Sequence, residues 1–175
     1  MKRAEFLKDI DNMSNHRVLL WEALKMTTGK IIEFGSGYGS TPQLGKFAQD
    51  TDRSFATYDA NNEWASKMDS VFVPNNDWDS IDAADASVLF LDHAPGERRE
   101  IDLAKYKDID GIIVIHDSEP AADHGYQMRQ HFDKFKYIVE VQTIGAWATM
   151  LSNSYDVTEC IGTKYKDYEI VAVSN

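Results

Sequence analysis

The segment best suited to chemistry is a glycine-rich turn. Residues 33–42 read Glu-Phe-Gly-Ser-Gly-Tyr-Gly-Ser-Thr-Pro. Because Gly35, Gly37 and Gly39 lack Cβ atoms, their backbone amides can come close to a ligand. A helix that begins near Pro42 points its amide dipoles into the same space. The turn is therefore a candidate cradle for a polar or anionic group of a ligand.

Asp59 is the second candidate for ligand binding, because it closes the next apolar run, residues 55–59. A carboxylate at the carboxyl end of the second strand can accept hydrogen bonds from both hydroxyls of a ribose. The same geometry serves NAD and other nucleosides, so Asp59 predicts nucleoside binding without selecting the nucleoside. A dinucleotide fingerprint has a further glycine where this chain has Ser40, which weakens the NAD interpretation.

Ionisable side chains gather where the fourth and fifth apolar runs end. These residues are Asp92, His93, His116 and Asp117. Placing such groups after buried strands is costly unless they are paired, ligate a metal or perform chemistry. Ligands bind at the carboxyl edge of a parallel sheet, so we expect these side chains to converge beside the glycine-rich turn.

Two interpretations of this cluster are chemical. In the first, Asp92 or His93 is the general base that takes a proton from a hydroxyl or amine of the substrate, called the acceptor below. In the second, Asp92 and Asp117 hold a divalent cation such as Mg²⁺, which lowers the pKa of the acceptor. A histidine then adds a further ligand, and the candidates are His116, His93 and His124.

The third interpretation of the cluster is structural. His116 and Asp117 bind the neighbouring loop and the pair Arg98-Arg99, and so fix the rim of the site. Metal sites built from oxygen ligands have no sequence spacing as diagnostic as that of cysteine zinc sites. The sequence therefore leaves all three interpretations open.

Alternating apolar and amphipathic segments must position these residues. Strands are predicted at residues 30–34, 54–58, 70–73, 87–91 and 111–115, and helices at residues 43–49, 63–68, 97–106 and 127–132. Near-continuous apolar runs suit strands that are covered on both faces. The alternation predicts an α/β fold with a Rossmann-like, doubly wound and mostly parallel sheet.

Segments on either side of this core complete the predicted architecture. Ser14-Asn15 is expected to cap a helix that Gly29 stops. Residues 137–143 and 146–151 predict a C-terminal antiparallel hairpin that closes the sheet. Residues 168–173 predict either one more short strand or an oligomer contact.

In this setting the turn resembles the first motif of class I S-adenosylmethionine-dependent methyltransferases. That motif is an acidic residue followed by Gly-x-Gly-x-Gly at the end of the first strand, and residues 33–39 fit it without a gap. The resemblance implies that the glycines embrace the methionine end of the cofactor and that Glu33 orients its ammonium group, directly or through water. The implied cofactor-binding residues are Glu33, Gly35, Ser36, Gly37, Gly39, Ser40, Thr41, Asp59, Asn61, Asp77 and Trp78. A purely structural glycine turn is the alternative.

The resemblance extends to adenine and to the acceptor. Asp77 and Trp78 stand where the family usually contacts adenine, so Trp78 is expected to stack on the base and Asp77 to accept its amino group; an ordinary turn with a packed Trp78 is the alternative. Residues 92–99 and 116–120 resemble small metal-associated O-methyltransferases. After the fourth strand there is no Asn/Asp-Pro-Pro-aromatic motif, which argues against methylation of the exocyclic amino groups of nucleic-acid bases.

Composition sets the outer bounds of the prediction. The chain of 175 residues is expected to form one domain, 1–175. The resemblance to the methyltransferase family covers residues 14–152, approximately. A formal net charge of −11 disfavours nucleic acids and anionic membranes as partners. The single cysteine, Cys160, and the absence of a signal peptide or membrane-spanning run predict a cytoplasmic protein. The domain has little room for an acceptor lid, so a homo-oligomer is expected to complete the pocket.

The predicted function is transfer of a methyl group from S-adenosylmethionine to a small-molecule acceptor. The residues expected at the chemistry are Asp92, His93, His116 and Asp117, and O-methylation assisted by a divalent metal is the more specific form of the hypothesis. A module that binds S-adenosylmethionine or another nucleoside without catalysis is one alternative. An NAD-dependent oxidoreductase is the other.

Overall fold

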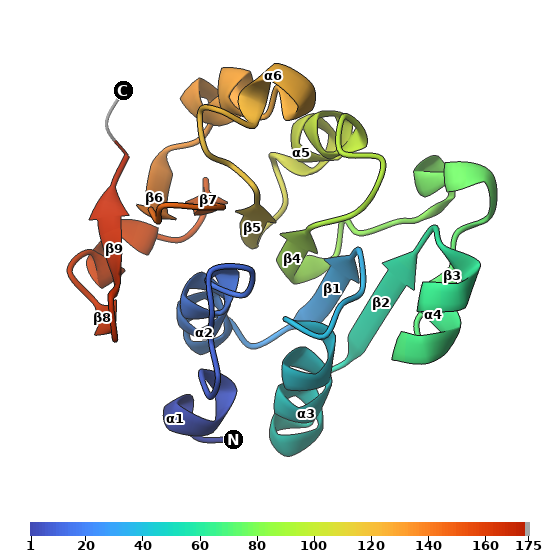
Figure 1. Cartoon of the computed structure of the whole chain (residues 1–175), viewed down its shortest axis with the longest axis horizontal. Coiled ribbons are helices and arrows are strands. Elements are labelled where there is room, and N and C mark those ends of the chain that lie inside the picture. The colour runs from blue at the N-terminus through green and yellow to red at the C-terminus, as the bar shows by residue number, and fades with distance from the viewer. Residues whose placement is uncertain (174–175) are drawn as a thin grey trace.

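A nine-stranded sheet positions the site (Figure 1). The computed structural model describes residues 1–173 of the chain. The strands are β1 (Lys30–Phe34), β2 (Phe55–Asp59), β3 (Val71–Phe72), β4 (Ala86–Leu91), β5 (Ile112–His116), β6 (Tyr137–Val141), β7 (Ala148–Ser152), β8 (Lys164–Tyr165) and β9 (Tyr168–Ala172). In space their order is β3-β2-β1-β4-β5-β7-β6-β9-β8.

The strands up to β5 run parallel, and the later ones add antiparallel pairs. β1 pairs in parallel with β2 and β4, and β4 pairs in parallel with β5. β7 then runs antiparallel between β5 and β6. Every residue of β4 and β5 is buried, as expected of apolar runs covered on both faces. The predicted fold class, a mostly parallel Rossmann-like sheet closed by an antiparallel hairpin, is confirmed.

Helices cover both faces of this sheet. They are α1 (Arg3–Phe6), α2 (His16–Met26), α3 (Thr41–Thr51), α4 (Asn62–Met68), α5 (Arg98–Tyr106) and α6 (Asp123–Tyr126). α2 and α3 lie on one face, and α5 and α6 lie on the other (Figure 1). Alternate side chains of β4 serve the two layers, because Val88 and Phe90 join the core under α2 whereas Leu89 and Leu91 pack with Leu103 of α5.

The amino end of α2 is held differently from the prediction. Asn15 precedes the helix with a helical backbone, and its side chain makes no capping hydrogen bond. The Asn15 amide donates instead to the backbone carbonyl of Ala146, in the turn between β6 and β7. This contact ties the start of α2 to the hairpin beyond β5.

The carboxyl end of α2 is closed by an arginine from a later segment. The helix stops at Met26, before the glycine expected to stop it. Arg53 donates to the carbonyl oxygens of Leu24 and Thr27, at 3.1 Å each, and so satisfies carbonyls that a helix end leaves without partners. Local sequence around Gly29 carries no trace of this contact.

Two late segments also refine the prediction. The single helix predicted at 127–132 is wrong, because α6 ends at Tyr126 and a 3-10 helix covers Arg129–Lys134. Gln127, with a left-handed φ of 51°, separates the two. Of the two possibilities for residues 168–173, the short strand is found, since β9 pairs with β6.

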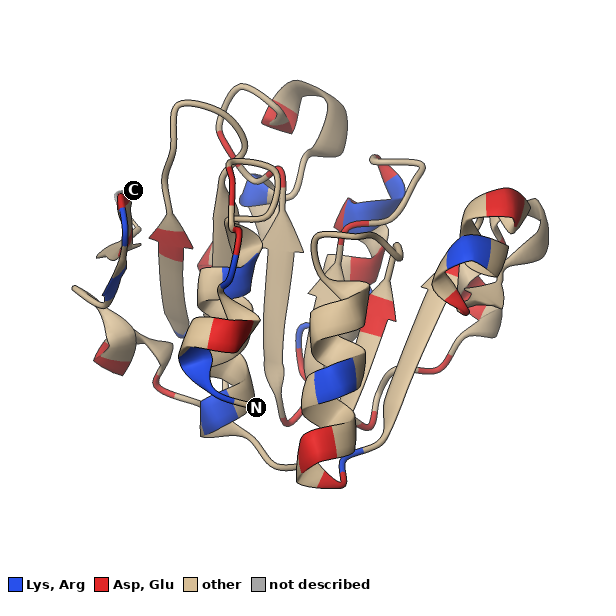
Figure 2. Ribbon diagram, turned by 60° about the horizontal axis from the view of Figure 1, so that its bottom comes forward, with Lys and Arg blue, Asp and Glu red and all other residues tan. Residues whose placement is uncertain are grey.

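Charged side chains are mixed over the surface. Figure 2 shows Lys and Arg distributed over several helices and loops, interspersed with Asp and Glu. Within residues 1–173, no helix combines the length and the apolar composition needed to cross a lipid bilayer.

Candidate functional site

The glycine-rich turn begins where β1 ends and is packed directly onto the end of β4. Gly35 has a φ of +90°, in the left-handed region that favours glycine. A Cβ atom there would lie 2.5 Å from the carbonyl carbon and oxygen of Asp92. The sheet pairing continues up to the turn, because the Asp92 amide donates to the Phe34 carbonyl at 2.8 Å. The turn and the end of β4 therefore form one unit.

Glu33 supports the turn from inside the protein. Its side chain is fully buried and accepts hydrogen bonds from the hydroxyls of Ser40, Thr41 and Thr57, the last two at 2.7 Å. Burial raises the pKa of Glu33 to about 7, although the three hydroxyls oppose the shift. The Thr41 hydroxyl also accepts from the amide of Gly37 at 2.8 Å. The direct contact expected between Glu33 and the ammonium group of the cofactor is corrected, because the Glu33 carboxyl group is buried against the hydroxyls that hold the turn.

Asp59 lies beside the turn at the carboxyl end of β2, as predicted. One carboxylate oxygen accepts from the amide of Ser36 at 2.9 Å and from its hydroxyl at 3.1 Å. The other oxygen accepts from the amide of Asn61 at 2.8 Å. Asn61 itself is exposed and caps α4 by accepting from the amide of Trp64, and the Trp64 indole donates to the carbonyl of Ser36. Ser36 is thus held from both sides.

Trp78 and Asp77 differ in their access to a ligand. Trp78 is fully buried, with the rings of Phe34 and His93 at centroid distances of 5.3 and 4.3 Å. Its indole nitrogen donates to the carbonyl of Ala94 at 3.2 Å. Stacking on adenine is therefore corrected to core packing, since no face of Trp78 reaches the surface. Asp77 is exposed.

His93 also belongs to the core rather than to the chemistry. Its side chain has no exposed surface, and its Nε2 atom lies 2.9 Å from a carboxylate oxygen of Asp102, which is equally buried. Asp102 is paired in addition with Arg98 at 2.8 Å. Burial lowers the pKa of His93, and Asp102 only partly offsets this. The expectation that His93 is a general base is wrong, because the side chain points into the layer under α5.

Asp92, His116 and Asp117 do converge at the ends of β4 and β5. The Nδ1 atom of His116 lies 3.4 Å from Asp92 Oδ1 and 3.6 Å from Asp117 Oδ1. Burial alone would lower the pKa of His116, but the two carboxylates raise it. The side chains of Asp92 and Asp117 remain 25% and 23% exposed, so this part of the predicted cluster can meet a ligand.

Arg99 fixes the positions of these two carboxylates. Its guanidinium lies 3.1 Å from the carboxylate of Asp92 and 3.0 Å from that of Asp117. It also donates to the backbone carbonyls of His93 and His116, at 2.8 and 3.2 Å. The interpretation that the cluster fixes the rim of the site by contacts with arginine therefore holds for Asp117 and Arg99. Arg98 instead pairs with Asp79 and Asp102.

His16 also lies in the site. From sequence, residues 15–17 were expected either to close over an acceptor or to serve as an exposed helix cap. His16 begins α2, and its ring lies 4.6 Å from that of His116 and 4.7 Å from that of Phe90, centroid to centroid. The ring also adjoins the last glycine of the turn, since a Cβ on Gly39 would be 3.4 Å from it. The only sequence signal is a histidine at the start of the helix before β1, and helix capping explains that position equally well.

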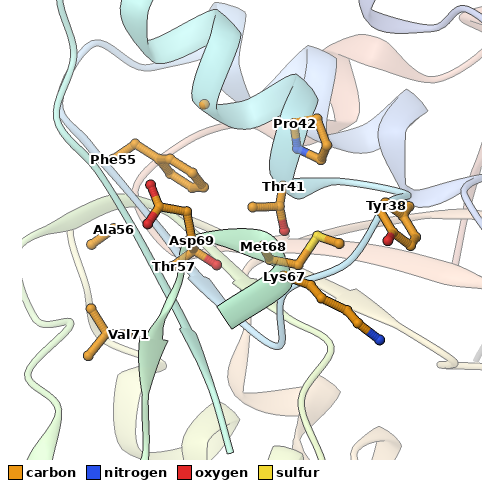
Figure 3. Close-up of a pocket in the computed structure, with 11 residues that line it drawn as sticks. Tyr38, Thr41, Pro42, Phe55, Ala56, Thr57, Lys67, Met68, Asp69 and Val71 are labelled. Atoms are coloured by element: carbon orange, nitrogen blue, oxygen red, sulfur yellow. The ribbon is translucent and has the colours of Figure 1, made fainter. Parts of the chain in front are cut away.

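A separate groove of about 630 Å³ lies on the far side of the turn (Figure 3). Tyr38 and Thr41 line it near the turn, and Phe55, Met68 and Val71 line it from β2, α4 and β3. Gly35, Asp59 and Asp92 take no part in its lining. Thr41 is the one predicted cofactor residue in this lining, so the groove is largely distinct from the edge of the sheet where the others meet.

Comparison with known proteins identifies the fold. No protein-family model and no curated protein matches the chain. Cofactor-bound Rv0187 from MTB is similar in structure, with a TM-score of 0.57 and 12% identity over 85% of this chain and 83% of its own. The METTL16 MTase domain has a TM-score of 0.52 and 15% identity, over 81% of this chain and 65% of its own. Human methyltransferase 10 domain containing protein has a TM-score of 0.51 and 16% identity, over 82% and 84%. The chain thus has the fold of class I S-adenosylmethionine-dependent methyltransferases.

Proposed function

We propose that this chain transfers a methyl group from S-adenosylmethionine to a small-molecule acceptor. The observation that carries the proposal is the contact between Ser36 of the glycine-rich turn and Asp59, at the carboxyl edge of a sheet with the methyltransferase strand order. The similarity to two solved methyltransferase structures supports it.

The residues around the turn fit the cofactor. A Cβ atom at Gly37 would meet nothing closer than the backbone nitrogen of Gly39, 4.0 Å away, so the outer side of the turn is open to ligand atoms. Asp59 is only partly buried, and an ionised carboxylate can accept about four hydrogen bonds. Ser36 and Asn61 supply three such bonds, so Asp59 has capacity left for one ribose hydroxyl. When bound, S-adenosylmethionine supplies an electrophilic methyl group on a sulfonium.

The acceptor would bind on the β4 and β5 side of the turn. Asp92 and Asp117 are the partly exposed carboxylates there, and Arg99 fixes them in place. Their negative charge favours an acceptor that loses a proton as it reacts, such as a hydroxyl or an amine. The net charge of −11 makes a small molecule a better acceptor than a nucleic acid.

Binding of S-adenosylmethionine and S-adenosylhomocysteine, measured by calorimetry, tests the proposal. We expect both to bind and Asp59→Ala to weaken binding by at least about tenfold, because a charge-assisted hydrogen bond contributes roughly 1.5–3 kcal/mol. Asp110→Ala, an exposed carboxylate at the other edge of the sheet, is the matched control and should bind normally. Failure of the wild-type chain to bind either nucleoside would refute the function.

Turnover separates an enzyme from a binding module. Release of S-adenosylhomocysteine should be assayed against phenols, catechols, hydroxy acids and amines. Tight binding of the nucleoside without turnover on any of them would favour the non-catalytic alternative. Tight binding of NAD with no binding of S-adenosylmethionine would favour an oxidoreductase.

A further inference from the structure

Three side chains from separate parts of the chain meet beside the glycine-rich turn. They are His16 at the start of α2, Asp92 after β4 and His116 at the end of β5. One nitrogen or oxygen atom of each lies within 4.8 Å of those of the other two. Ligands held 2.0–2.2 Å from a tetrahedral ion are about 3.4 Å apart, which is the spacing already found between Asp92 Oδ1 and His116 Nδ1, 3.4 Å. A small movement of the His16 side chain towards the other two would bring all three ligand atoms to this spacing.

The two histidines have unused nitrogen atoms. His16 and His116 are 1% and 2% exposed. Within residues 1–173, three of their ring nitrogens have no hydrogen-bond partner: both nitrogens of His16 and the Nε2 atom of His116. A buried polar atom without a partner is unfavourable by about 1–3 kcal/mol, and an ion bound to one ring nitrogen of His16 would remove that cost for this atom.

The charges around the cluster suit a cation. Around the cluster, Asp92 and Asp117 face one guanidinium, that of Arg99, so the carboxylates exceed the fixed positive charge.

From this arrangement we propose that His16, Asp92 and His116 bind one divalent first-row transition-metal ion. Two imidazoles and one carboxylate select Zn²⁺ and its neighbours in the series, whereas Mg²⁺ prefers oxygen ligands and retained waters. Asp117 is not assigned as a ligand, because only His16, Asp92 and His116 bring one ligand atom each within 4.8 Å of the other two. The metal pair expected from sequence, Asp92 with Asp117, thus gives way to a set that includes α2.

The role of the ion rests on the proposed methyl transfer, although its binding does not. A hydroxyl acceptor on the ion would have a lowered pKa and would lose its proton to bulk water. The acceptor oxygen then forms a bond to the methyl carbon while the bond from that carbon to sulfur breaks. The electron pair stays on sulfur, which leaves S-adenosylhomocysteine and the methyl ether.

Metal binding by the full chain is the direct test. Protein stripped with a chelator is titrated with Zn²⁺ by calorimetry and with Co²⁺ by visible absorption, whose bands report imidazole and carboxylate ligands. We expect one ion per chain. We also expect His16→Ala, His116→Ala and Asp92→Asn each to weaken binding by at least about tenfold.

Two control variants make the result specific. His124→Ala removes an exposed imidazole outside the cluster, and Asp110→Asn removes an exposed carboxylate at the other edge of the sheet. Both should bind the ion like wild type. Circular dichroism and thermal melting establish whether each variant is folded. If His16→Ala does not fold, His16→Gln, which keeps a polar side chain, is tested in its place.

Either of two results would overturn the site. One is absence of stoichiometric binding of Zn²⁺ and Co²⁺ to the folded wild-type chain. The other is unchanged binding of the ion in folded His16→Ala. Binding of S-adenosylmethionine to the metal-free chain is measured separately with Asp59→Ala, so failure of the metal site leaves the proposed function standing, and the reverse also holds.

Discussion

The carbonyl carbon of Asp92 lies 2.5 Å from the point where a side chain on Gly35 would begin. This one contact joins the turn proposed to hold the cofactor to the residue proposed to face the acceptor. Both the left-handed φ of Gly35 and the backbone of β4 exclude any larger residue there.

Gly35→Ala is therefore expected to lower the free energy of unfolding by about 2–4 kcal/mol, the sum of backbone strain and overpacking. Urea denaturation measures the change. Gly37→Ala is the matched control, because its Cβ meets nothing within 4 Å except the Gly39 nitrogen at 4.0 Å. Gly37→Ala should keep its stability within about 1 kcal/mol yet bind S-adenosylmethionine more weakly. Equal stability losses in the two variants would contradict the packing described.

Glu33 should make the stability of the protein depend on pH. Its pKa is raised from 4.5 to about 7 in the folded state, so the folded chain holds this proton more tightly than the unfolded chain. The contribution of Glu33 to the free energy of unfolding is then greatest below pH 4.5 and falls as the pH rises towards about 7. At 1.36 kcal/mol per tenfold change in proton affinity, the fall is on the order of 3 kcal/mol.

Comparison with Glu33→Gln isolates this contribution. Urea unfolding of both chains between pH 4.5 and 8 is the measurement, and the difference between them cancels groups that titrate in both. The variant should gain stability relative to wild type as the pH rises. A difference that stays constant over this range would show that Glu33 is not held as a buried acid.

His93→Asn distinguishes a core histidine from a catalytic one. The substitution removes a buried ring that packs on Trp78 and lies beside Asp102, so we expect a loss of about 2–4 kcal/mol in stability. Affinities for S-adenosylmethionine and Zn²⁺ should not change, because His93 reaches neither site. Loss of either affinity in a variant of unchanged stability would restore His93 to the functional site.

Arg53→Met should weaken the end of α2. The change keeps much of the apolar stem but removes the donors to Leu24 and Thr27, and we expect a loss of about 1–3 kcal/mol. Lys46→Met removes an exposed cation paired with Asp50 and should shift stability by less than about 0.5 kcal/mol. Thermal melting of the two variants side by side gives the comparison.

The strands could be predicted from sequence because their apolar runs are nearly continuous. The bounds predicted for the first strand, 30–34, match β1, and those of the fourth and fifth differ from β4 and β5 by one residue. Once strands 1, 4 and 5 are neighbours, the convergence of Asp92, His116 and Asp117 follows. Asp59 was found for the same reason, because it ends its strand.

The direction of individual side chains could not be predicted in this way. His93 follows Asp92 in the chain, yet the alternation of the backbone sends it into the opposite layer. Trp78 lies in a turn whose sequence does not show that Phe34 and His93 enclose it. His16 joins the site only because α2 packs across the ends of β4 and β5, a tertiary contact without a local signal.

The order of the strands has a consequence for association between molecules. The sheet terminates on one side in β3 and on the other in β8, each only two residues long. Short outer strands offer few unpaired backbone groups on which another chain can build, and this guards a wide sheet against growth by strand addition. Lengthening β3, where Val71 and Phe72 are already exposed, would remove that protection and turn the molecule towards aggregation.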